Sequence, residues 1–172
     1  MKHERYFWRF WLGGLAIMAI MIALNPMFVS DVSPWGIRNH QSAGSAAQVD
    51  AIQSAWQAAG VMEYAQAMLA LDFAYIAMYS FGAFCGGRMF LAANRAPLKW
   101  LGAIILVAAV LIAVADSIET VCQLIQALQV KGDDRLAGIA AAAQPIKSTG
   151  FFTSLVAIPL ALAVRRRLVK RA

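Results

Sequence analysis

Four ionisable side chains lie within or at the edge of stretches of this 172-residue sequence that are otherwise largely apolar: Asp72, Asp116, Glu119 and Lys147. A charge within a membrane helix costs about 2.5–3.5 kcal/mol on insertion scales, so such groups are expected to face the interior of a helix bundle and to pair. Lys147 is the nearest cation in the sequence pattern, and we expect it to pair with Asp116 or Glu119. Three acids against one lysine leave an excess of carboxyl groups, an arrangement that suits proton exchange or general acid–base chemistry.

The positions of these residues predict a common depth in the membrane. Asp72 precedes Arg88 by 16 positions, which is about 24 Å along a helix. Asp116 follows Lys99 by 17 positions, which is about 25 Å. Lys147 stands at the start of the last apolar stretch. We therefore expect side chains from three helices to meet in the outer third of the membrane.

Neighbouring polar side chains extend this set. Tyr75 and Tyr79 follow Asp72 at spacings of three and seven, so they share its helix face and could donate hydrogen bonds into the same pocket. The same two tyrosines are equally typical of an ordinary helix core. Gln123 follows Glu119 at a spacing of four and continues its polar stripe. The whole set permits three interpretations: a network that only fixes helix register, a ligand or substrate site, or a proton or ion path.

No cofactor or metal is predicted. His3 and His40 fall outside the apolar stretches, so haem or zinc held within the bundle is not expected. The sequence has no glycine-rich phosphate loop and no serine-centred hydrolase elbow. Cys85 and Cys122 fall toward opposite ends of the predicted spans, which excludes a disulfide bond between them.

Composition indicates which elements position these residues. The sequence is 61% hydrophobic and 14% charged, whereas soluble domains have roughly 45–50% apolar and about 25% charged residues. The apolar residues form four blocks, which predict an all-α, four-helix transmembrane bundle in a single domain, residues 1–172. The spans are expected at about 10–30, 65–87, 100–126 and 148–164. An uncleaved first span is favoured over a signal peptide, because the run is long and no small-x-small cleavage site follows it.

Residues 31–64 form the predicted long loop between the first two spans. In its second half, Ser45 is a candidate N-cap, and Val49, Ile52 and Trp56 recur at helical spacing. This pattern predicts a short amphipathic helix that ends near Gly60. Such a helix would lie on the membrane surface or cover one end of the bundle.

The basic residues predict the orientation. The net charge of +6 comes from residues beside the apolar blocks and not from one soluble face, so no nucleic-acid partner is expected. The basic residues precede the first block (Lys2, Arg5, Arg9), separate the second from the third (Arg88, Arg95, Lys99) and follow the fourth (Arg165, Arg166, Arg167, Lys170, Arg171). We expect a protein of a bacterial-type inner membrane, and the positive-inside rule predicts that both its termini lie in the cytoplasm and the 31–64 loop outside. The 131–147 segment is expected to be a second outer loop.

The order of these motifs resembles a group of uncharacterised bacterial four-span membrane proteins. The matching stretches are Trp35-Gly36-Ile37 through Trp56, Leu71-Asp72-Phe73 through Tyr79, Ala115-Asp116-Ser117-Ile118-Glu119, and Ala143-Gln144-Pro145-Ile146-Lys147. The resemblance implies the same topology and a polar cluster of an aspartate, an Asp-x-x-Glu pair and a lysine. This chain departs from the pattern at Thr120, where asparagine is usual, and near Asn39, where an acid is usual. The resemblance implies no activity.

Three functional hypotheses follow. The first is a binding or transport-type protein that holds a small amphiphile, a lipid or a quinone-like molecule, with membrane lipids as its partners. The second is an accessory subunit of a larger membrane complex or a homo-oligomer, in which the polar network is structural. The third is a small membrane enzyme that uses two carboxyl groups as acid and base.

Overall fold

The computed structural model describes residues 2–93 and 95–170, and this part of the chain forms helices without a β-strand. In chain order the helices are α1 (Lys2–Leu24), the 3-10 helix η1 (Asn25–Phe28), α2 (Ile37–Gln41), α3 (Ala46–Ala58), α4 (Met62–Leu91), α5 (Ala96–Gln129) and α6 (Asp134–Lys170). The α1–η1 segment, α4, α5 and α6 are each long and apolar enough to cross a membrane. The predicted all-α bundle is therefore confirmed. Arg171 of the basic C-terminal cluster lies outside the described residues.

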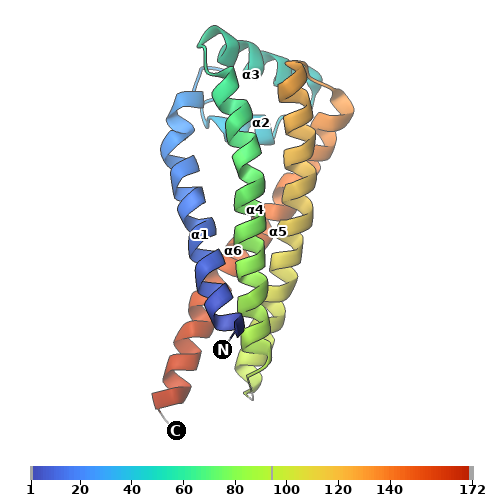
Figure 1. Cartoon of the computed structure of the whole chain (residues 1–172). Coiled ribbons are helices and arrows are strands. Elements are labelled where there is room, and N and C mark those ends of the chain that lie inside the picture. The colour runs from blue at the N-terminus through green and yellow to red at the C-terminus, as the bar shows by residue number, and fades with distance from the viewer. Residues whose placement is uncertain (1, 94, 171–172) are drawn as a thin grey trace.

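The four long helices run side by side (Figure 1). In the described part of the chain α1 packs against α4, α4 against α5, and α5 against α6. Both marked ends of the chain lie at the same end of the bundle as the turn between α4 and α5 (Figure 1). The opposite end carries α2 and α3. All three predicted basic clusters therefore belong to segments at one end of the molecule.

Glycine allows α1 and α4 to approach closely. A Cβ atom added to Gly82 would collide with the backbone of Trp11, and one added to Gly14 would lie 2.7 Å from the Tyr79 backbone. Small residues at such crossings let two membrane helices pack through backbone contacts. This packing fixes α4, which carries Asp72, against the first helix.

Residues 29–61, called the cap below, cover one end of the bundle. Ser45 accepts a hydrogen bond from the backbone N–H of Gln48 and so caps α3, as predicted. Val49 and Trp56 are buried, and the Trp56 indole N–H donates a 2.9 Å hydrogen bond to the Phe28 carbonyl. The apolar side of α3 packs onto the ends of the long helices. The predicted amphipathic helix is therefore present and lies on the bundle end.

Two elements differ from the sequence-based expectation. Helix α6 begins at Asp134, so the segment expected to be an outer loop, 131–147, is mostly helical. Asp133 caps this helix, because its carboxylate accepts a 2.9 Å hydrogen bond from the Leu136 N–H, and the alanine-rich turns that follow favour a helix. Lys147 consequently lies inside a helix and not at its entrance. The turn-rich start of the cap contains the additional five-residue helix α2.

Candidate functional site

The side chain of Lys147 joins α6 to two acids of α5. Its ammonium nitrogen Nζ lies 2.8 Å from Asp116 Oδ1 and 2.7 Å from Glu119 Oε1. The two acids are one helical turn apart and point to the same side, so one ammonium group reaches both. Both carboxylates are almost completely buried. A buried charge is tolerated only when it is paired, and the lysine supplies that pairing for both acids.

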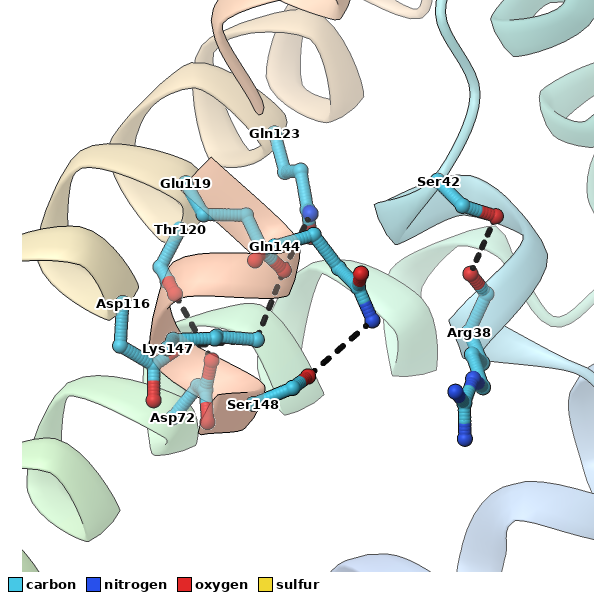
Figure 2. A network of polar contacts seen from close by, with 10 residues as sticks. All are labelled: Arg38, Ser42, Asp72, Asp116, Glu119, Thr120, Gln123, Gln144, Lys147 and Ser148. Carbon is cyan, nitrogen blue, oxygen red and sulfur yellow. Dashed lines mark hydrogen bonds and ion pairs between the residues drawn. The ribbon is translucent and has the colours of Figure 1, made fainter. Parts of the chain in front are cut away.

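Asp72 completes the cluster from α4. The Thr120 hydroxyl of α5 donates a 2.7 Å hydrogen bond to Asp72 Oδ2, and the Asp72 side chain is buried. Thr120 follows Glu119 directly in the sequence, so it projects from a different part of the α5 surface, toward α4 (Figure 2). The three acids and the lysine, which the sequence places on three helices, thus come together as one cluster.

Glu119 and Gln123 form the inner side of this cluster. Gln123 Nε2 donates a 2.9 Å hydrogen bond to Glu119 Oε1, the same oxygen that Lys147 contacts. Glu119 Oε2 and Gln123 Oε1 are buried without a hydrogen-bond partner in the described part of the chain. Neither residue is among those that line the cavity described below. We therefore assign this pair the role of orienting the Lys147 ammonium.

A cavity of about 300 Å³ adjoins the cluster. Asp72, Asp116 and Lys147 line its polar side, together with Gln144 and Ser148 of α6. The Gln144 amide donates a 3.3 Å hydrogen bond to the Ser148 hydroxyl. Acceptor and donor groups are thus concentrated on one wall of the cavity.

The remaining walls of the cavity are apolar. They are formed by Met18, Met21 and Ile22 of α1 and by Phe151 and Phe152 of α6. Ile22 and Phe152 are among the exposed large side chains of the molecule. The cavity therefore opens sideways between α1 and α6, on a surface made of membrane-length helices. It combines one polar wall with apolar walls, which is typical of small-molecule sites.

The cap forms the roof of the cavity. Ile37, Arg38 and Gln41 of α2 line it, and Figure 2 shows Arg38 on a different side of the site from Gln144 and Ser148. These roof residues were not among the predicted site residues, because a five-residue helix has too few turns to produce a periodic pattern. Gln144 and Ser148 were also missed as site residues, since they belong to the segment that was expected to be a loop or the edge of a span.

The buried His40 anchors α2 within the cap. Its ring lies against Trp56 with ring centroids 5.2 Å apart, and its Nε2 lies 3.1 Å from Gln53 Nε2. Burial lowers the pKa of His40 to about 4, because the charged imidazolium loses its hydration. His40 is therefore neutral near pH 7, and it positions the same short helix that carries Arg38.

The two predicted tyrosines occupy different places. Tyr75 lines the cavity beside Asp72. The Tyr79 hydroxyl lies 3.0 Å from the Ser154 hydroxyl, one turn further along α4. Tyr79 also packs on Phe151, with ring centroids 5.3 Å apart. Tyr75 thus belongs to the cavity wall, whereas Tyr79 belongs to the core between α4 and α6.

Comparison of the chain with protein families, curated proteins and solved structures finds no match. The resemblance to bacterial four-span proteins stays a prediction. The chemistry of the cavity and its cluster is consequently what indicates a function.

Proposed function

We propose that this protein binds a small amphiphile within the membrane, at the cavity beside Asp72, Asp116 and Lys147. The polar part of the ligand contacts the cluster, and its apolar part lies against the methionines of α1 and the phenylalanines of α6. The observation that carries this proposal is the division of one cavity into a charged wall and apolar walls. A volume of about 300 Å³ fits a small ligand or the polar part of a larger lipid.

The sideways opening supports entry from the membrane. Ile22 and Phe152 stand at the exposed edge of the cavity, and both are apolar. An amphiphile dissolved in the bilayer already has its polar group near the surface and its apolar part among the acyl chains. It can therefore enter between α1 and α6 without passing through water.

We also propose that the cap faces outward from a bacterial inner membrane, with both chain ends in the cytoplasm. The support is the distribution of charge along the sequence. The basic residues flank the spans at the end that holds both termini, and basic flanks favour the cytoplasmic side. The site then lies toward the outer leaflet.

Native mass spectrometry after gentle detergent extraction tests the binding proposal. The wild-type protein is expected to carry a bound small amphiphile. In the variant Ser148→Trp an indole enters the cavity from its polar wall, and the bound ligand should be lost. The matched control is Thr153→Trp, on the same helix, which faces a separate groove lined by Trp100 and Ile104.

The comparison between the two tryptophan variants decides the result. Loss of ligand in Ser148→Trp with retention in Thr153→Trp supports the cavity as the site. A wild-type protein without ligand, or equal ligand retention in both variants, contradicts it. A tightly associated second protein chain in the same spectra would favour the accessory-subunit hypothesis instead.

A further inference from the structure

We propose that the ligand is a zwitterionic amphiphile whose ammonium group contacts Asp72 and whose anionic group contacts Arg38, as in the amino-phosphate headgroup of a phospholipid. This inference rests on the proposed function and specifies its ligand. The inference is carried by Asp72 and Arg38, which stand on the walls of one cavity and carry opposite charges. Neither makes an ion pair in the described part of the chain. Both residues line the cavity.

The lysine of the cluster is already engaged. Lys147 Nζ lies within 2.8 Å of both Asp116 and Glu119, so its charge and two of its three N–H groups are used within the protein. An anionic ligand group would have to compete with two buried carboxylates for this ammonium. Lys147 is therefore a poor site for an anion, and the polar wall as a whole favours a donor or a cation.

Asp72 is the acid that remains available. Its Oδ2 accepts the hydrogen bond of the neutral Thr120, and no ion pair of Asp72 is present among the described residues. The carboxylate lines the cavity and is buried. A primary ammonium carries three N–H donors, so it can both neutralise this carboxylate and donate to it. Tyr75 and Ser148, which also line the cavity, offer further acceptor oxygens for the same group.

Arg38 supplies the opposite charge at the roof. It extends from α2 on the exposed side of the cavity, and its guanidinium makes no ion pair within residues 2–93 and 95–170. A guanidinium binds phosphate oxygens in a two-pronged geometry. Because Arg38 and Asp72 belong to different walls, one ligand can contact both only if it carries its two charges at separate positions, as a zwitterion does.

The apolar walls then receive the remainder of the ligand. The headgroup fills the cavity, and the acyl chains leave it between Ile22 and Phe152 into the bilayer. The cavity volume of about 300 Å³ is too small for two complete acyl chains but fits a headgroup. The orientation places the phosphate near the cap and the ammonium deeper, next to Asp72.

Native mass spectrometry with three added phospholipids of identical dioleoyl chains tests the inference. Phosphatidylethanolamine has a primary ammonium, phosphatidylcholine has a quaternary ammonium without N–H donors, and phosphatidylglycerol has no cation. We expect phosphatidylethanolamine to bind at least about tenfold more tightly than phosphatidylglycerol, with phosphatidylcholine between them. Asp72→Asn keeps an acceptor for Thr120 and should reduce the preference to less than about twofold. Arg38→Gln should weaken the binding of all three lipids to a similar extent.

Two exposed residues at the same end of the molecule provide matched controls. Glu63→Gln on α4 removes one negative charge outside the cavity and is the control for Asp72→Asn. Arg135→Gln on α6 removes one positive charge outside the cavity and is the control for Arg38→Gln. Both controls should preserve the lipid preference of the wild type. Phosphatidylglycerol binding as tightly as phosphatidylethanolamine, or an unchanged preference in Asp72→Asn, overturns the zwitterion inference. If Ser148→Trp still abolishes binding of these lipids, the proposed function survives that result. If Ser148→Trp leaves lipid binding unchanged, the proposed function fails as well.

Discussion

The Lys147 ammonium of α6 lies 2.7 Å from the Glu119 carboxylate of α5, and Glu119 is completely buried. The same ammonium contacts Asp116. One lysine therefore balances two acids inside a membrane-length helix pair. Removal of this lysine leaves two neighbouring carboxylates without a counter-charge, whereas removal of one acid leaves the lysine paired with the other.

This asymmetry predicts a ranking of stability. Lys147→Met should lower the free energy of unfolding by about 3–5 kcal/mol, because it leaves buried charge uncompensated. Glu119→Gln should cost less, since Asp116 still pairs with Lys147. The measurement is thermal unfolding in detergent, monitored by circular dichroism. The control is Glu4→Gln, which breaks a partly exposed pair with Arg165 and should cost at most about 1 kcal/mol. A Lys147→Met protein that unfolds like the wild type would refute the ranking.

Close packing of α1 on α4 predicts the effect of one added methyl group. Gly82→Ala places a Cβ atom 2.8 Å from the Phe10 carbonyl carbon, so the helices must separate, at about 1–3 kcal/mol. Gly138→Ala in α6 is the control, because nothing lies within 4 Å of its added Cβ. The control should be neutral or more stable by about 0.5–1 kcal/mol, since alanine is the better helix residue. Equal melting temperatures for the two variants would count against the packing described.

His40 predicts a pH-dependent cap. Its pKa is about 4 in the folded cap and near 6.5 when the cap is open. Between these values only the open state binds the proton, so the cap has its full stability above pH 6.5 and loses stability as the pH falls toward 4. The total loss is about 3 kcal/mol, at about 1.36 kcal/mol for each pKa unit.

Hydrogen exchange monitored by mass spectrometry measures the pH dependence of cap stability. After correction for the intrinsic pH dependence of exchange, peptides from α2 and α3 should exchange faster at pH 4.5 than at pH 7. His40→Gln removes the titrating group and should flatten the difference. Protection of the cap that is the same at both pH values in the wild type would contradict the assignment to His40.

Single-cysteine labelling tests the orientation. The two native cysteines, Cys85 and Cys122, are buried and unpaired, and both are replaced by alanine. Ser42→Cys in the cap should react with a membrane-impermeant maleimide in cells whose outer membrane has been removed and whose inner membrane is intact. Ala92→Cys, in the turn after α4, should react only after permeabilisation. The reverse pattern would place the cap in the cytoplasm.

The spans and the cluster were predictable because both depend on properties that are local in the sequence. Asp72 and Asp116 stand out in apolar surroundings, and the rise of a helix converts their spacing from Arg88 and Lys99 into depth. Lys147 stands at the start of an apolar stretch. The cap helix was predictable for the same reason, since Trp56 and its apolar neighbours recur at helical spacing.

Other features depend on contacts that no local pattern contains. Tyr79 shares a helix face with Asp72, yet it bonds to Ser154 because α6 passes beside it at that level. Arg38 reaches the cavity only because α2 folds back over the bundle. The helical segment before Lys147 is the exception, because its causes are local: Asp133 caps α6 through one hydrogen bond, and the alanine-rich turns that follow favour a helix.

A density map of the protein in lipid would show whether the cavity beside Asp72 holds an amphiphile. The protein is reconstituted in nanodiscs of native lipid and enlarged with an antibody fragment for electron cryomicroscopy. We predict an elongated density that contacts Asp72 and passes between Met21 and Phe151 toward the bilayer. A map in which protein side chains fill this space would contradict amphiphile binding. So would a map with ordered side chains around the cavity and no density beside Asp72.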